Sequence, residues 1–256
     1  MCDANYAGVW HLGEGDSTDA DFYQDSTNNN EHGTLTDANG NSTAAAGQIG
    51  DAYDFNGDAD RIDIPNFSQY LTTAMTISGW VSPPAPHGDH DGYFGIRNGD
   101  VDHSFYILQL VSRSDLELRF RNSVGNAYDA NVGSAVSSGN WVFVALTYDG
   151  NDLVSYVDGQ MATQEPTATG SFSSSAHSFS IGAVGGNPLD GIVDEVRVSN
   201  TARTACWVGA SYNNQAWPDK AVVPTPDPSP NPSEGFYGVD APTAVELVSF
   251  TARGLD

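Results

Sequence analysis

A series of short β-type runs separated by turn residues is the feature that most constrains the fold of this chain. Apolar and polar residues alternate within these runs, or β-branched residues predominate, and Gly, Asn, Asp or Pro separate one run from the next. The runs cover residues 6–12, 52–56, 61–65, 75–81, 92–97, 104–111, 116–122, 127–132, 141–148, 152–157, 178–184 and 191–199. Many short strands at close intervals are typical of an antiparallel sandwich or barrel. We therefore predict an all-β fold made of two packed antiparallel sheets.

One stretch, residues 204–214, is predicted to be a helix at the end of this β region. Thr204 is a suitable N-cap, and Trp207 and Tyr212 are expected to face a sheet. Two other tryptophans, Trp80 and Trp141, alternate with small or polar neighbours, and we expect them to fill the space between the sheets.

The charge balance excludes several classes of function. The 256 residues include 33 Asp and Glu but nine Lys and Arg, for a net charge of −24. Such a chain repels phosphate backbones, so we predict no nucleic-acid partner. No apolar run reaches the 18 or so residues of a membrane helix, so we predict no membrane insertion. Acidic, nearly Lys-free surfaces stay soluble in concentrated salt, which favours a saline or halophilic origin.

The chain divides into three segments by composition. We assign residues 1–217 to one β domain and residues 218–243 to a Pro-rich linker, in which five prolines fall within 222–232. Residues 244–256 alternate again, as the first strand of a following domain or as a tail strand that returns to this sheet. The start of the chain has no basic and apolar leader pattern, which favours a fragment of a longer protein.

Several ordered motifs resemble those of one known superfamily. They cover residues 76–81, 141–150, 154–159, 189–203 and 210–215. Together they resemble the concanavalin A-like lectin/glucanase superfamily, specifically laminin-G-like jelly rolls of secreted bacterial and archaeal proteins, over roughly residues 5–215. The resemblance implies a jelly-roll sandwich and an extracellular or cell-surface location. The resemblance does not identify the function, which must be inferred from particular binding or catalytic sites.

An oxygen-rich loop at residues 25–33 is the first candidate site. Carboxylate and amide oxygens at close spacing suit a hard cation such as Ca²⁺. The resemblance implies a structural calcium ion shared with the strand that carries Asp194, with Asp25 and Asp194 as carboxylate ligands and with Asn28 and Asn30 adding oxygens. The alternative is an Asn-rich turn whose side chains cap their own backbone. Asp60 is a weaker alternative ligand, by analogy with the pentraxin branch.

A Pro-rich loop before the run at 92–97 is a second candidate. His87 and Asp89 lie in it, with Tyr93 just beyond, and rim loops of jelly rolls commonly bind sugars, so these are weak candidates for ligand binding. Tyr93 or Tyr106 would then offer a stacking face. A solvated loop without a ligand is the competing interpretation.

Two residues, Cys2 and Cys206, are the cysteines of the chain. Sandwich termini often lie close together, so a disulfide between them is geometrically possible. Free thiols are the alternative. A second expected contact is between Arg197 and Asp194 or another buried carboxylate, because a buried guanidinium is costly unless it is paired.

Catalytic motifs are missing from the sequence. The paired acids of retaining glycosidases, in the arrangement Glu-x-Asp-x-x-Glu, do not occur, and neither do Gly-x-Ser-x-Gly or His-Glu-x-x-His. We therefore predict a non-catalytic carbohydrate-binding or adhesion module that binds a polysaccharide or a glycoprotein glycan. The alternative is a structural β-domain that contacts neighbouring protein subunits, and a glycoside hydrolase or polysaccharide lyase comes third.

Overall fold

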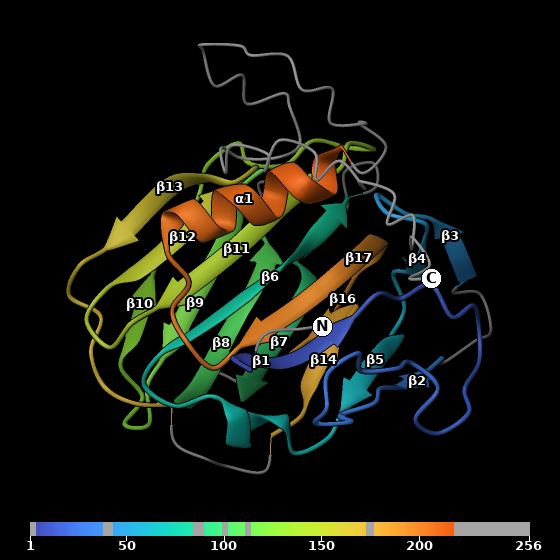
Figure 1. Ribbon diagram of the computed structural model, residues 1–256, viewed down its shortest axis with the longest axis horizontal. Helices are drawn as coiled ribbons and strands as arrows, with labels where there is room; N and C mark the ends of the chain where they lie inside the picture. The colour runs from blue at the N-terminus through green and yellow to red at the C-terminus, as the bar shows by residue number, and fades with distance from the viewer. Residues whose placement is uncertain are drawn as a thin grey trace, which may run out of the picture.

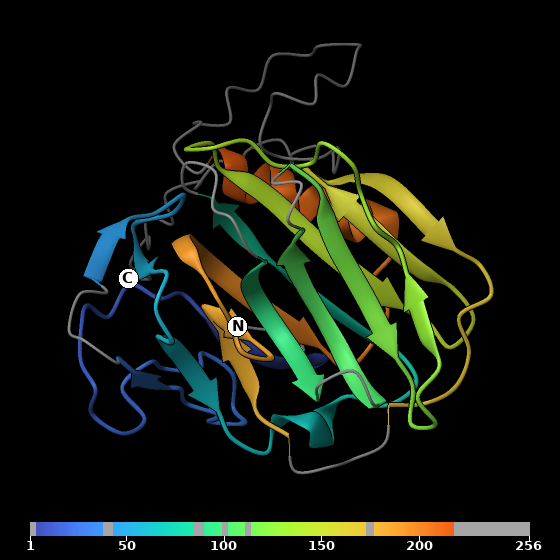
Figure 2. The ribbon, with the colours of Figure 1, turned by 180° about the vertical axis from the view of Figure 1, so that it is seen from behind.

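Two large antiparallel sheets face each other in the computed structural model (Figures 1 and 2), as the sequence predicted. The structure describes residues 4–37, 43–83, 90–98, 102–110, 114–172 and 177–217, so the predicted linker and final strand at 218–256 lie outside it. Among the described residues, no helix is both long and apolar enough to cross a bilayer.

The first sheet has eight strands in the order β13-β12-β11-β6-β17-β4-β3, with β1 also paired to β17. Its strands are β1 (Tyr6–Trp10), β3 (Thr43–Ala46), β4 (Asp51–Asn56), β6 (Met75–Ser82), β11 (Val142–Tyr148), β12 (Leu153–Val157), β13 (Gln160–Glu165) and β17 (Asp190–Ser199). The central strands β6 and β11 are buried along their whole length, because one face packs on the other sheet and the other face is covered.

The second sheet has seven strands in the order β10-β9-β8-β7-β14-β5-β2. Its strands are β2 (Thr34–Thr36), β5 (Arg61–Ile64), β7 (Asp91–Asn98), β8 (Asp102–Gln109), β9 (Leu116–Arg121), β10 (Ala127–Asp129) and β14 (Phe179–Ile181). A short hairpin, β15 (Ala183–Val184) with β16 (Asn187–Pro188), follows β14 and packs on β7. A 3₁₀ turn, η1 (Phe67–Tyr70), lies between β5 and β6.

Apolar side chains from both sheets fill the space between them. The ring of Trp10 lies 5.3 Å from that of Phe67 and 5.5 Å from that of Phe179, between ring centroids. At the other end of the core, Phe120 stacks on Tyr148 at 4.1 Å. Large buried aromatic rings contribute strongly to core stability, so this core holds the two sheets in a fixed relation.

One helix, α1 (Ala205–Ala216), covers the outer face of the eight-stranded sheet (Figure 1). The Thr204 side chain accepts a hydrogen bond from the Trp207 backbone N–H, as expected of the predicted N-cap. Figure 2 shows the opposite face, where no helix covers the seven-stranded sheet among the described residues. The two outer faces therefore differ in what they offer to a partner.

The prediction that Trp80 and Trp141 lie between the sheets is wrong. Both pack with Phe143 and Val208 under α1, and Trp80 Nε1 donates to Gln215 Oε1 at 2.9 Å. The reason is strand parity, since alternate residues point to opposite faces. The inward residues of β6 are Met75, Ile77 and Val81, which places Trp80 on the outer face.

Candidate functional site

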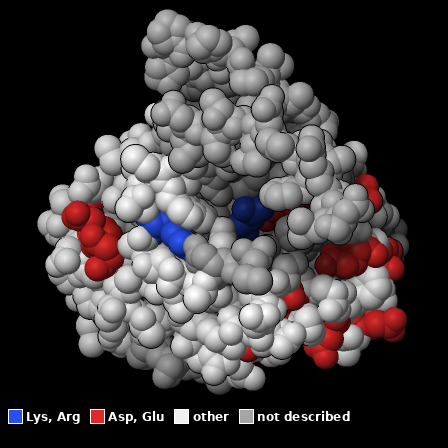
Figure 3. Space-filling model, viewed as in Figure 1, with Lys and Arg blue, Asp and Glu red and all other residues white. Residues whose placement is uncertain are grey.

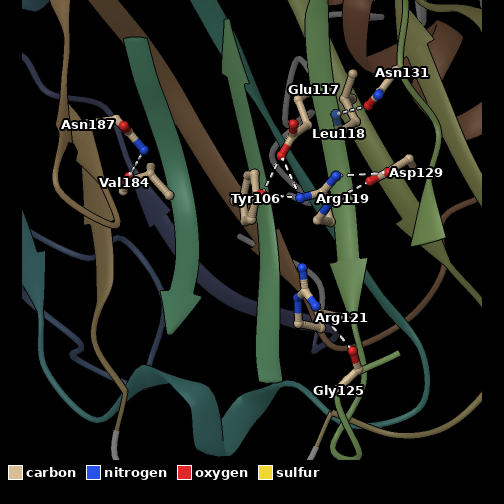
Figure 4. A network of polar contacts seen from close by, with 10 residues as sticks. All are labelled: Tyr106, Glu117, Leu118, Arg119, Arg121, Gly125, Asp129, Asn131, Val184 and Asn187. Atoms are coloured by element: carbon tan, nitrogen blue, oxygen red, sulfur yellow. Dashed lines mark hydrogen bonds and ion pairs between the residues drawn. The ribbon is translucent and has the colours of Figure 1, made fainter. Parts of the chain in front are cut away.

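Strand β9 places a row of charged side chains on the uncovered face of the seven-stranded sheet. Its residues Leu116, Leu118 and Phe120 point into the core. Because successive side chains alternate between faces, the intervening Glu117, Arg119 and Arg121 point outward. Figure 4 shows these side chains beside those of the neighbouring strands.

Arg119 is fixed by two carboxylates and a phenol (Figure 4). Its Nε donates to Asp129 Oδ1 at 2.5 Å and its Nη2 to Asp129 Oδ2 at 2.9 Å, in a two-bond arrangement with β10. Its Nη1 lies 3.2 Å from Glu117 Oε1 and 3.4 Å from the Tyr106 hydroxyl. The hydrogen bonds to Asp129 raise the pKa of Arg119, which therefore stays charged.

Arg121 lies next along the same face and has fewer partners. Its Nη1 donates to the backbone carbonyl of Gly125 at 3.1 Å, whereas its Nε is buried without a hydrogen-bond partner. Among the described residues, no carboxylate forms an ion pair with Arg121, in contrast to Arg119. Arg121 therefore carries a positive charge that this part of the protein does not neutralise.

Tyr106 of β8 forms the floor between these arginines and β7. The Arg97 guanidinium lies over its ring, 5.4 Å from the centroid, at the distance of a cation–π contact. Its hydroxyl donates to Glu117 Oε1, and burial raises the pKa of Tyr106, so the phenol stays neutral. The ring is buried and presents no stacking face to solvent.

The hairpin β15–β16 forms the opposite wall of a hollow. Val184 packs on Tyr106 and Leu108, and Asn187 Nδ2 donates to the Val184 carbonyl at 3.0 Å. Gly92 of β7 permits this close approach, because a Cβ atom there would lie 2.4 Å from the Val184 backbone nitrogen. The hairpin is therefore seated directly on the sheet.

Two hollows lie beside this hairpin and share Arg97. The first has a volume of about 420 Å³ and is lined by His90, Arg97, Leu108, Glu117, Arg119, Arg121 and Asn187. The second, about 390 Å³, is lined by residues that include Arg61, Arg97, His177 and Ser180. We call the first the β9 hollow and the second the β5 hollow. Both volumes lie in the lower part of the range of ligand pockets.

The hollows concentrate the scarce positive charge of the chain. Four of the nine Lys and Arg residues line them, namely Arg61, Arg97, Arg119 and Arg121. On the opposite face, acidic side chains gather at both sides of the view in Figure 3. The hollows were not predicted from the sequence, although the alternation of apolar and charged residues in 116–121 is a signal for an outward row of charged side chains.

The residues of the predicted calcium loop are arranged as in the alternative interpretation, in which side chains cap their own backbone. Asp25 Oδ1 accepts from the backbone N–H groups of Val9 at 3.0 Å and Thr27 at 2.9 Å. Asp25 Oδ2 accepts from Thr27 Oγ1 at 2.6 Å and from the Glu31 N–H at 3.1 Å. Four accepted hydrogen bonds occupy the roughly four lone-pair positions of a carboxylate. The Asp25 oxygens are therefore already satisfied by the loop.

Asn28 and Asn30, the two asparagines expected to add calcium ligands, lie at the exposed surface of this loop. The Asn30 side chain donates to the Asn28 backbone carbonyl at 3.0 Å, and Asn30 adopts a left-handed conformation with φ 56°. Asp60, the weaker alternative ligand, is buried just before β5.

Asp194 lies on β17 and is buried in the first sheet. Its Oδ2 accepts from the Ile49 N–H at 2.9 Å, while its Oδ1 has no hydrogen-bond partner, and burial raises the pKa of Asp194 to about 7. Arg197 pairs with Glu195, Nη2 to Oε2 at 2.5 Å, which is the second of the two pairings considered from the sequence.

The described donors do not fit a calcium ion as they stand. Within the described residues, no three His, Cys, Asp or Glu side chains form a group that could hold a metal ion. Asp194 has a free acceptor, but Asp25 has none, so the described donors do not form a preformed cage. The calcium ion stays a prediction.

The remaining predicted site residues are the sugar-binding candidates and the two cysteines. His87, Asp89 and Cys2 lie outside the described residues. Tyr93 is buried, and its hydroxyl donates to Gln109 Oε1 at 2.6 Å, so its ring offers no face to a sugar. Cys206 is exposed and has no disulfide among the described residues. Because Cys2 lies outside them, the disulfide between the two stays a prediction.

Comparison with known proteins gives both a family match and structural neighbours. The family model described as Laminin_G_3, concanavalin A-like lectin/glucanases superfamily, matches residues 56–209. No curated protein sequence matches the chain.

Domain 4 of AbnA, an extracellular arabinanase from Geobacillus stearothermophilus solved in complex with arabinotriose, has a TM-score of 0.65 and 21% identity. The similarity covers 80% of this chain and 96% of that domain. The binding domain of Paraclostridial Mosquitocidal Protein 1 has a TM-score of 0.60 and 15% identity, with 82% of this chain and 52% of that chain covered.

The binding domain of botulinum neurotoxin DC, in complex with SialylT, has a TM-score of 0.58 and 11% identity. The similarity covers 83% of this chain and 52% of that chain. The chain therefore spans about half the length of these two toxin domains. At such identities the three likenesses show a shared fold.

Proposed function

Because the chain belongs to the concanavalin A-like lectin/glucanase superfamily, we propose that it is a non-catalytic carbohydrate-binding module of an extracellular or cell-surface protein. The observation that carries this proposal is the β9 hollow on the uncovered face of the seven-stranded sheet. Its polar lining offers donors and an acceptor to sugar hydroxyls, while the other sheet is covered by α1.

The neighbours support a binding role over a catalytic one. One is a domain of a larger arabinanase and is described with arabinotriose, and the botulinum domain is described with SialylT. The binding domain of botulinum neurotoxin DC is also described in complex with rat synaptotagmin II, so the fold also accommodates protein partners. The β9 hollow of this chain has the volume of a small-ligand site. This volume favours a glycan over a protein partner.

Retention on a broad panel of immobilised polysaccharides tests the proposal, with and without a chelator. We expect at least one glycan to retain the protein, with no release of reducing sugar. Asn187→Trp is expected to abolish retention, because its larger side chain fills the hollow from the hairpin wall. Asn151→Trp is the matched control, since Asn151 is exposed in the turn between β11 and β12. Failure to bind any glycan would favour the structural role instead.

A further inference from the structure

The arginines of the β9 hollow differ in whether they are neutralised, and this difference selects a class of ligand. Arg119 is paired with Asp129 and Glu117. Arg121 lies two residues away on the same face, with a backbone carbonyl as its hydrogen-bond acceptor and no ion pair among the described residues. A partly shielded guanidinium without a counterion attracts an anionic group more strongly than an exposed one.

We propose that the β9 hollow binds an acidic glycan, with the carboxylate of a uronic acid residue received by Arg121. This inference rests on the proposed carbohydrate-binding function. The planar guanidinium matches a carboxylate through parallel N–H···O bonds. Glu117 and Asn187 line the same hollow and supply an acceptor and a polar amide for the sugar hydroxyls.

The lining argues against a neutral sugar held mainly by stacking. Tyr106, which forms the floor, is 1% exposed and lies beneath Arg97 and Val184. Among the described residues, no Phe, Tyr or Trp side chain lines the β9 hollow, and His90 is the one lining residue with an aromatic ring. Recognition in the β9 hollow is therefore expected to come mainly from charge and hydrogen bonds.

The charge of the whole chain argues for a carboxylate rather than a densely sulfated polymer. A net charge of −24 repels a polyanion at long range. Among the described residues, four arginines line the two hollows and supply local attraction there. A ligand with one carboxylate per sugar is therefore repelled less by the rest of the chain than a multiply sulfated one.

Calorimetry with matched oligosaccharides tests this proposal. The probes are oligogalacturonate, oligoglucuronate and oligomannuronate, each compared with the same oligosaccharide after its carboxylates are methyl-esterified. We expect at least one acid form to bind about tenfold or more tighter than its ester, which corresponds to about 1.4 kcal/mol. Heparin-type and chondroitin sulfate fragments are expected to bind more weakly than the uronate.

Variants connect this preference to Arg121. Arg121→Gln is expected to bring the acid and ester forms to equal affinity, and Arg121→Lys to restore part of the difference, because a lysine keeps the charge but loses the planar fork. Gln164→Glu changes the net charge by the same amount at an exposed position on β13 and is expected to keep the preference. Unchanged melting temperatures and circular dichroism show that each variant is folded.

The outcomes separate this inference from the proposed function. Equal binding of acid and ester, or binding to neutral glycans alone, overturns the inference and leaves the carbohydrate-binding module standing. Tighter binding of sulfated fragments overturns the choice of a carboxylate. If the acid preference persists in Arg121→Gln, the site is elsewhere, and if no glycan binds at all, the proposed function fails as well.

Discussion

At the residue scale, the carboxylate of Asp25 explains how an Asn-rich loop is ordered. Three backbone N–H groups and one hydroxyl, from Val9, Thr27 and Glu31, all point at its two oxygens. Such capping removes the cost of leaving backbone donors unpaired. The loop next to β1 therefore has an internal reason to adopt its shape.

Replacing this carboxylate tests the capping role. Asp25→Ala leaves the Val9, Thr27 and Glu31 N–H groups without their acceptor, and we expect the free energy of unfolding to fall by roughly 2 to 4 kcal/mol. The measurement is urea unfolding in a chelator, so that bound calcium plays no part. If calcium binds as the resemblance implies, CaCl₂ raises the melting temperature of the wild type. A variant as stable as the wild type in chelator would contradict the capping role.

The raised pKa of the Asp194 carboxyl predicts that the stability of the protein depends on pH. Burial raises its pKa to about 7 from 3.8, so between these values the folded protein holds a proton that the unfolded chain has lost. Stability from this group is therefore fully present below about pH 4 and falls as the pH rises through about 7. Asp194→Asn keeps an acceptor for the Ile49 N–H, and we expect it to reduce the loss between pH 4 and 8 by roughly 2 to 4 kcal/mol.

The measurement is the unfolding free energy as a function of pH in the presence of a chelator. Part of the slope remains in Asp194→Asn, because the hydrogen bond that protonated His11 donates to the Glu195 carboxylate raises the pKa of His11 and adds a loss of stability above pH 6.5. Asp51→Asn, at an exposed position on β4, serves as the control and is expected to keep the full slope. An unchanged profile in Asp194→Asn would show that this carboxyl is ionised in the folded protein.

At the scale of elements, α1 decides which sheet is available to a ligand. Tyr212 packs 5.6 Å from Trp80 and 6.1 Å from Phe143, between ring centroids, and attaches the helix to β6 and β11. Tyr212→Ala is expected to lower the unfolding free energy by about 2 kcal/mol and to increase amide exchange in α1 more than in β9. Glycan affinity should not change, since the β9 hollow lies on the opposite sheet.

The same element shows how far the sequence predicts this fold. The helix and its N-cap at Thr204 were readable, because capping is a local signal. The sequence did not predict on which face of β6 Trp80 lies, because alternation defines two faces of a strand without showing which one meets the other sheet. An apolar residue on the outer face of β6 is explained only by α1, which covers that face and lies about 120 residues later in the chain.

The candidate site depends on register, which is a non-local property. Tyr106 lies opposite Arg119 on one side and opposite Gly95 on the other, and Arg119 lies opposite Asp129. A slip of one residue in any of these pairings would turn a charged side chain toward the core. Residues 116–121 show the alternation. The carboxylates that pair with Arg119, and the fact that no described carboxylate pairs with Arg121, follow only from the assembled sheet.

At the scale of the whole molecule, the acidic surface predicts that salt stabilises the protein. The net charge of −24 makes the folded chain repel itself in dilute buffer. The Debye length falls from about 10 Å at 0.1 M salt to about 3 Å at 1 M, so repulsion between neighbouring surface carboxylates is still being screened in this range. We expect the melting temperature to rise continuously from dilute buffer to molar NaCl.

A variant with fewer surface charges distinguishes screening from a general effect of salt on burial. Asp19 and Asp21 are exposed in the loop before Asp25. The double substitution Asp19→Asn with Asp21→Asn is expected to raise the melting temperature in dilute buffer and to make the rise with NaCl shallower, because less repulsion remains to be screened. Equal slopes in the variant and the wild type would assign the effect to apolar burial, and a flat profile in both would contradict a surface adapted to salt.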